Sequence, residues 1–172
     1  MKKIVFLLAF VLFTFTNTQA QTVGVVDTKQ ILQEIPEYNA AQKQLDQIVE
    51  GWRKEIEQKH KKVDEMYRAY QAEQVLLTEN ERSRREQSIV DKEKEMREFQ
   101  KTKFGPEGEL FQKRQELVQP IQDDVYEAIE KAAKKKKIDI VFDKSEGASI
   151  LFFTKDYDMT SSVLRELGIS TN

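Results

Sequence analysis

The sequence has 172 residues, of which 34% are charged and 39% hydrophobic, and its formal net charge is −2. A general nucleic-acid binder carries a strongly basic surface, so this mildly acidic balance gives no support for that class. The chain contains no cysteine, which excludes disulfides and thiolate metal sites.

Residues 1–20 are typical of a secretory signal peptide. Lys2 and Lys3 form a positive n-region, residues 4–15 are apolar, and small residues precede a cleavage site after Ala20. The apolar run is short for a membrane span, which needs about 20 residues, although a retained N-terminal anchor is the alternative. Cleavage would remove two lysines and leave 26 basic and 30 acidic residues, a charge of −4. No second long apolar segment follows, so we expect the exported chain to be soluble.

A short strand is predicted at Val23–Val26, and a long segment rich in Glu, Lys, Arg, Gln and Ala follows it. One unbroken helix over about 100 residues would be roughly 150 Å long. The apolar pattern stops after Leu77, and Thr78 and Glu81 fit the N-cap and N3 positions of a capping box. A helix that begins there follows a turn, so we predict a helical hairpin with its apex near residues 77–80. An extended coiled-coil dimer without fold-back is the alternative.

Both arms of this hairpin carry a narrow apolar stripe of the coiled-coil type, surrounded by charge. The ascending stripe comprises Leu45, Ile48, Trp52, Ile56, Val63, Met66, Tyr70 and Leu77. The descending stripe comprises Ile89, Met96, Phe99, Phe104, Phe111, Val118, Ile121, Val125, Ile129 and Ala132.

The descending arm is interrupted by the sequence GPEG at residues 105–108, which is poorly suited to a helix interior. If the chain folds back about residue 79, Gly51 of the ascending arm lies opposite this break. We therefore predict a shared joint that acts as a hinge. A fixed kink, packed by Trp52 and Phe104, is the alternative. The hinge residues would be Gly51, Gly105, Pro106 and Gly108.

The C-terminal part predicts a small β-rich base. The expected elements are a strand at 138–142, a turn at 144–147, a strand at 148–154 and a short helix at about 159–167. Asp158 is expected to be the N-cap of that helix and Gly168 its C′ residue. The predicted fold is therefore α+β, with a helical hairpin (37–120) inserted between the first two strands of a body (21–36 and 121–172).

The strand that contains Ile150 to Phe153 is apolar on both faces. A small single domain would leave one face of an antiparallel sheet in water and show alternation. One face can pack on the protomer's own helices, so the other is expected to need a second subunit. We therefore predict an obligate oligomer whose sheet or barrel forms on assembly. The interface would include Val25, Ile140, Phe142, Ile150, Phe152 and Phe153.

The sequence offers little for catalysis or for cofactor binding. The single histidine, His60, lies among charged arm residues, and no phosphate-binding loop is present. Three aspartates at strand ends, Asp27, Asp139 and Asp143, fit turns better than a metal site. The lysines at 134–137 could bind phosphate or lipid headgroups, but a helix C-terminus also favours cations. We predict no enzymatic activity, no metal and no cofactor.

The order of elements resembles the Skp/OmpH family of periplasmic chaperones over residues 22–168. The resemblance rests on VGVVDTKQIL before the arm, GPEGELFQKRQELVQPIQDDVYEAIEKAAKKKKIDIVFD after it, and DMTSSVLREL near the end. It implies a homotrimer in which a β-barrel body carries three helical tentacles around a cavity. It also implies ATP-independent holding of unfolded outer-membrane proteins in the periplasm.

Aromatic side chains that the arm cannot fully bury are the candidate contacts with such clients: Trp52, Tyr67, Tyr70, Phe99 and Phe104. Relatives often have strongly basic tentacles, whereas residues 79–103 contain eight basic and seven acidic residues. Membrane or lipopolysaccharide contact is therefore not supported by the charge of the arm. A structural coiled-coil spacer or adaptor of the cell envelope is the alternative function.

Overall fold

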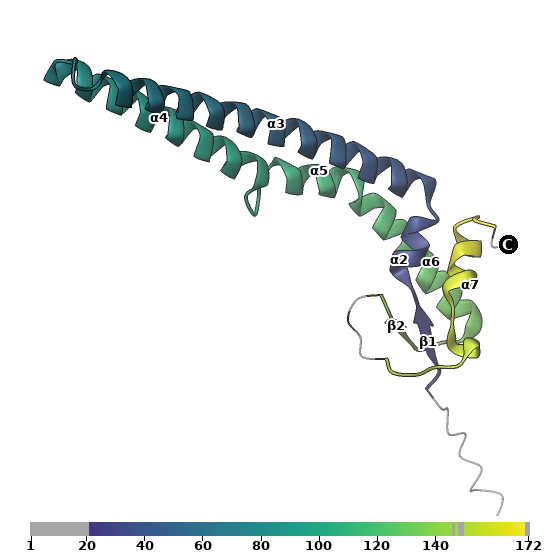
Figure 1. Cartoon of the computed structure of the whole chain (residues 1–172). Coiled ribbons are helices and arrows are strands. Elements are labelled where there is room, and N and C mark those ends of the chain that lie inside the picture. Colours follow the sequence, from purple (N-terminus) through teal and green to yellow (C-terminus); the bar gives the residue numbers. More distant parts are fainter. Residues whose placement is uncertain (1–20, 146, 148–149, 171–172) are drawn as a thin grey trace, which may run out of the picture.

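The computed structural model describes residues 21–145, 147 and 150–170; the predicted signal peptide lies outside these residues. A long two-helix arm extends from a small body that contains both ends of the described chain (Figure 1). The predicted fold class, a small sheet with a helical hairpin inserted between its strands, is confirmed for the single chain.

The sheet of the body consists of β1 (Val23–Val26) and β2 (Ile140–Asp143), which pair in parallel. Val23 pairs with Ile140 and Val26 with Asp143. Parallel strands need a crossover connection, and here the whole helical arm forms that connection. The second strand begins two residues later than the sequence predicted.

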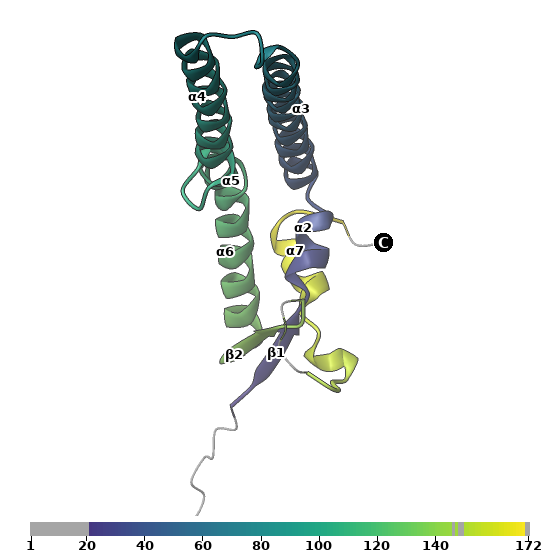
Figure 2. The same cartoon turned by 60° about the vertical axis from the view of Figure 1, so that its left-hand side comes forward.

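The arm turns back on itself between α3 (Pro36–Glu73) and α4 (Glu79–Phe104), and the two helices lie side by side in Figures 1 and 2. Pro36 occupies the first turn of α3, where its missing N–H is no loss. The predicted capping box is confirmed: the Thr78 hydroxyl accepts from the backbone N–H of Glu81, and the Glu81 carboxylate accepts from that of Thr78. These bonds satisfy donors at the start of α4 and fix the position of the turn.

The descending chain continues through α5 (Glu109–Leu117) and α6 (Gln119–Lys136) into the body. α6 ends at Lys137, whose φ of 55° and ψ of 44° are left-handed. The backbone N–H of Ile138 then bonds to the Ala133 carbonyl at 2.9 Å, which closes the helix end.

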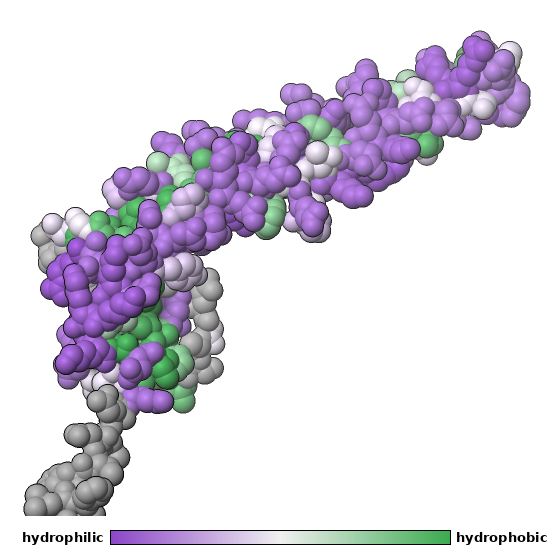
Figure 3. Space-filling model, turned by 180° about the vertical axis from the view of Figure 1, so that it is seen from behind, coloured by the Kyte–Doolittle hydropathy of each residue, from purple (hydrophilic) through white to green (hydrophobic). Residues whose placement is uncertain are grey.

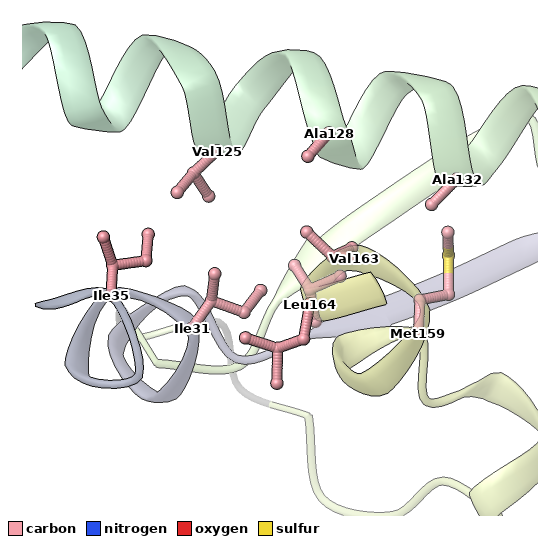
Figure 4. Close-up of a cluster of buried hydrophobic side chains, with 9 residues drawn as sticks. Ile31, Ile35, Val125, Ala128, Ala132, Met159, Val163 and Leu164 are labelled. Carbon is pink, nitrogen blue, oxygen red and sulfur yellow. The ribbon is translucent and has the colours of Figure 1, made fainter. Parts of the chain in front are cut away.

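Side chains from four elements form the core of the body. α2 (Thr28–Gln33) and α7 (Thr160–Glu166) pack with β1 against one side of α6 (Figure 4). Met159 and Val163 are fully buried there, and each side chain of this kind contributes about 1.5 to 3 kcal/mol when buried. The buried residues of the cluster are Val26, Ile31, Ile35, Val125, Ala128, Ala132, Met159, Val163 and Leu164.

The C-terminal helix begins one residue later than predicted. Met159, not Asp158, has the N-cap position, although the Asp158 carboxylate still accepts from the Thr160 N–H at 2.9 Å. Gly168 is at C′ as predicted, with a left-handed φ of 76°. The Ile169 N–H bonds to the Leu164 carbonyl at 2.9 Å, which completes a Schellman motif.

The prediction of a strand at 148–154 is wrong for residues 150–154, which form no strand in the single chain; residues 148–149 lie outside the described residues. One edge of β1 is paired with β2, and at the other edge Val25 bridges to Asp158. Residues 150–154 are thus not paired with either strand of the described chain. The chain instead passes through a short 3₁₀ helix (Lys155–Tyr157) before α7.

Candidate functional site

An apolar groove lies on the face of the sheet that points away from the core. Its volume is about 490 Å³, and it is lined by Val23, Val25, Phe142, Ile150, Phe152, Phe153, Thr154 and Tyr157. Phe152 is 83% exposed and the neighbouring Leu151 98% exposed. Exposure of large apolar side chains on a small body is typical of an interaction surface.

The groove brings together five of the six residues predicted at the oligomer interface. Ile140 does not line it, although Ile140 and Phe142 are both exposed on the same face of β2. Three lining residues, Val23, Thr154 and Tyr157, were not predicted. The strand period of two places Val23 on the same side as Val25 and could have identified it, whereas no local pattern indicated Tyr157.

Lys144 contacts both Phe153, which lines the groove, and two aspartates near the end of the sheet. Its ammonium lies 3.4 Å from the Asp158 carboxylate, 3.8 Å from that of Asp27 and 5.4 Å from the centre of the Phe153 ring. Burial acts to raise the pKa of Asp158, but hydrogen bonds from Thr160 and the Lys144 ammonium outweigh it and lower that pKa. Asp158 is therefore held ionised beside the lysine.

The five candidate client-contact aromatics lie at different depths in the arm. Tyr67 is 50% exposed. Tyr70 is buried in the seam, and its hydroxyl donates a hydrogen bond to the Glu86 carboxylate. That hydrogen bond raises the pKa of Tyr70 because ionisation would remove the donor. Client contact by these residues stays a prediction.

The other three aromatics form a partly buried cluster between the arms. Trp52 and Phe104 meet edge to face with ring centres 5.7 Å apart, and Lys103 lies 5.3 Å from the centre of the Phe99 ring. Their position in the seam agrees with the stripes predicted from the sequence.

Further large apolar residues are exposed on the arm and on α6, among them Phe111, which the sequence predicted in the descending stripe. Figure 3 shows a mostly hydrophilic arm with isolated apolar spots and a larger apolar area on the body. Val90, Phe111 and Tyr126 are 50%, 47% and 62% exposed, and Val75 and Leu76 at the tip exceed 80%. A narrow seam covers one stripe of each helix and leaves residues on its flanks uncovered.

Gly51 and residues 105–108, the predicted hinge residues, differ in backbone structure. Gly51 lies inside α3, which continues without interruption past it, and apart from its chain neighbours and the adjacent backbone of α3 no atom lies within 4 Å of the position that a Cβ would take. Residues 105–108 form a loop between α4 and α5. The break therefore lies in the descending arm alone, and whether it moves stays a prediction.

The strand-end aspartates have structural partners. Asp27 caps α2 by accepting from the Gln30 N–H at 2.8 Å, and Asp139 accepts from the Thr22 N–H at 2.9 Å. Burial acts to raise the pKa of Asp143, but hydrogen bonds from Thr28 and Ser145 lower it overall. Over the described ranges, no group of three or more His, Cys, Asp or Glu side chains is arranged to hold a metal ion.

The remaining charged candidates lie in ion pairs on the surface. His60 is exposed, with Nδ1 3.3 Å from the Asp64 carboxylate. Lys134 pairs with Glu130 at 2.6 Å and Lys135 with Glu166 at 2.8 Å.

Within residues 21–145, 147 and 150–170, no helix has the length and apolar character needed to cross a membrane.

Comparison with known proteins identifies a family for the chain. Residues 22–167 match the model of a family described as outer membrane protein (OmpH-like). The chain is 32% identical over 142 residues to an uncharacterized protein of Aquifex aeolicus (strain VF5), with 83% of each chain covered.

A solved structure shares the fold. It is the crystal structure of a candidate OmpH-like outer membrane chaperone from Caulobacter crescentus CB15, with a TM-score of 0.65 and 13% sequence identity. The match covers 92% of this chain and 94% of that one. At this identity the likeness shows the fold alone.

Proposed function

The chain belongs to the OmpH-like outer membrane protein family, and we propose that it is an ATP-independent holdase chaperone for unfolded outer-membrane proteins. The observation that carries this proposal is the spacing of half-exposed apolar side chains along a charged arm, such as Tyr67, Val90 and Phe111. A surface of this kind can contact apolar client segments at many separate points without one deep pocket.

The weakness of each contact explains why no nucleotide is needed for release. Covering the exposed half of one such side chain contributes about 1 kcal/mol, because full burial contributes about 1.5 to 3 kcal/mol. Several contacts together hold a client, while each one breaks thermally. Promiscuous binders commonly use adaptable surfaces of this type.

We propose that the functional unit is a homotrimer assembled through the groove. Phe152 and Leu151 are almost fully exposed in the single chain, and β2 pairs on one edge with β1 within the described chain. A neighbouring subunit would cover the apolar groove and remove the aggregation risk of a bare strand edge. Three arms would then enclose a space in which clients cannot meet each other.

We place the mature protein in the periplasm, after cleavage of the predicted signal peptide at Ala20. Membrane binding by the arm is not part of the proposal, because acidic and basic residues nearly balance along α4. Specific contact with anionic lipid needs a basic cluster, which this helix lacks.

The direct test dilutes a urea-unfolded outer-membrane β-barrel protein into buffer with the purified mature chain. Light scattering then reports aggregation, with and without ATP and with and without EDTA. We expect suppression at an equimolar ratio of oligomer to client in every condition. No suppression, or suppression only with ATP, would overturn the proposal.

One observation favours the alternative of a structural adaptor. Val75 and Leu76 are 82% and 83% exposed at the far end of the arm, where they could dock on a folded partner. A variant with Val75→Ser and Leu76→Ser distinguishes the two functions. A holdase that uses the length of the arm retains its activity in this variant, whereas an adaptor that docks through its tip loses its partner.

A further inference from the structure

The break at residues 105–108 is a closed loop. The Gly105 N–H still bonds to the Lys101 carbonyl at 2.8 Å, and the Gly108 N–H bonds to the Gly105 carbonyl at 2.9 Å. A Cβ on Gly105 would lie 2.4 Å from the Lys101 oxygen, and one on Gly108 would lie 2.7 Å from the Thr102 oxygen. Glycine is required at both positions because the backbone of Lys101 and Thr102 lies too close to leave room for a Cβ. The loop projects sideways between α4 and α5 (Figures 1 and 2).

One side chain, that of Lys103, connects the three helices that meet at this loop. Its ammonium lies 2.5 Å from the Glu109 carboxylate at the start of α5. It also lies 5.2 Å from the ring centre of Trp52 in α3 and 5.3 Å from that of Phe99 in α4. The side chain is only 18% exposed, although it is a lysine on a highly charged arm.

This environment makes the contact stronger than an ordinary surface ion pair. Exposed pairs contribute about 0 to 1 kcal/mol and are screened by salt, whereas partly buried charges are screened much less. Contact with aromatic faces adds a further attraction for the cation. The edge-to-face pair of Trp52 and Phe104 packs beside it.

We propose that Lys103 is a positioning residue that latches the joint between α4 and α5. While its ammonium is bound to Glu109 and to the two rings, the distal arm keeps one fixed angle relative to α5. Without the latch, residues 105–108 and the uncrowded glycine of α3, Gly51, are free to bend. This inference concerns the geometry of the arm and does not depend on the proposed holdase activity.

The test measures distances within one arm by pulsed EPR. The chain has no cysteine, so labels at Ser88→Cys and Gln115→Cys would be the only ones, on exposed positions of α4 and α5. Helix rise predicts a separation of about 30 Å. Doubly labelled chains are mixed with an excess of unlabelled chains, so that each oligomer carries one labelled arm.

We expect one narrow distance in the parent and in Lys103→Arg, which keeps the charge. Lys103→Met and Glu109→Gln should broaden the distribution. Lys113→Met is the matched control, because Lys113 pairs with Glu116 at 2.7 Å inside α5 and does not cross the break. This control should keep the narrow distance.

A broad distribution in the parent, or a narrow one in both Lys103→Met and Glu109→Gln, would overturn the latch. Helix content from circular dichroism must match the parent for a broadened distribution to count as bending. If Lys103→Met fails to fold, Glu109→Gln decides the question, since Glu109 is 42% exposed and the change preserves its shape.

Discussion

The ammonium of Lys59 in α3 lies 3.0 Å from the carboxylate of Glu95 in α4. The same carboxylate accepts a hydrogen bond from Lys92, one turn before it on α4, at 2.6 Å. Glu95 therefore joins the two arms and sets their register at the middle of the hairpin. Two ammonium groups on one carboxylate strongly favour its ionised form.

The first prediction concerns the titration of Glu95. The hydrogen bond from Lys92, with that from Lys59, lowers its pKa from 4.5 to about 2. Because the folded pKa is the lower one, the stabilising effect is present above pH 4.5 and is lost as the pH falls from 4.5 towards 2. NMR titration of the Glu95 side chain should show this shift. Lys92→Gln should move the pKa back towards 4.5; an unchanged low value would contradict our assignment of its cause.

The second prediction separates assembly from folding in the body. Phe152 is 83% exposed in the single chain, so Phe152→Ala should hardly affect the fold of one protomer. In an assembled interface the loss of a buried phenylalanine costs about 3 to 5 kcal/mol. Phe152→Ala combined with Phe153→Ala should therefore give slower-sedimenting species in analytical ultracentrifugation.

The tip provides a matched control for this experiment. Leu76 has the same 83% exposure but lies at the far end of the arm, so Leu76→Ala should sediment like the parent. If the double phenylalanine variant also sediments like the parent, the groove is not the interface.

The third prediction concerns the contact between Gly24 and Met159. A Cβ on Gly24 would lie 2.2 Å from the sulfur of Met159, which is fully buried. Gly24→Ala should lower the free energy of unfolding by about 1 to 3 kcal/mol through overpacking. In a Met159→Ala background the clash is absent, so the same mutation should cost much less. Urea unfolding of the four proteins at one concentration measures this coupling; additive costs would contradict the contact.

The fourth prediction is a stabilising mutation. Lys137 is exposed and has a left-handed backbone, which costs an L-residue about 1 to 2 kcal/mol. Lys137→Gly should therefore raise the free energy of unfolding by about 1 kcal/mol. Lys136→Gly, one residue earlier in the right-handed end of α6, should be neutral or destabilising. Thermal unfolding of both variants tests the difference, and equal effects would refute it.

The sequence predicted those features of the arm that depend on neighbouring residues. The capping box needs only Thr78 and Glu81, and four letters of sequence were enough to locate the start of α4. The register was close as well. A fold about residue 79 pairs position 59 with 99, and the Lys59 ammonium lies 5.1 Å from the centre of the Phe99 ring as well as 3.0 Å from the Glu95 carboxylate. The turn lies at residues 74–78, slightly before the predicted apex at 77–80.

Features of the body that depend on distant partners were predicted less well. The strand at 148–154 was inferred from its apolar composition, but a strand also needs a neighbour. Residues 150–154 pair with no strand of the described residues, and Val25 bridges to Asp158 instead. The groove was largely predictable, because Val25 and Phe142 belong to the apolar strands that the sequence analysis expected at an interface. The role of Lys103 was not, since its aromatic partners come from separate helices.

Tyr38 of α3 and Ile121 of α6 pack on one apolar cluster, so the two feet of the arm lie next to each other. The body therefore does not restrict the length of the helical arm that is inserted between β1 and β2. Removing seven residues from α3 and the facing seven from α4 would shorten the arm by about 10 Å and preserve the heptad seam. Arm length can in this way evolve separately from the oligomerising body. Homologues could thus scale the space that they enclose in heptad steps while the sheet stays the same.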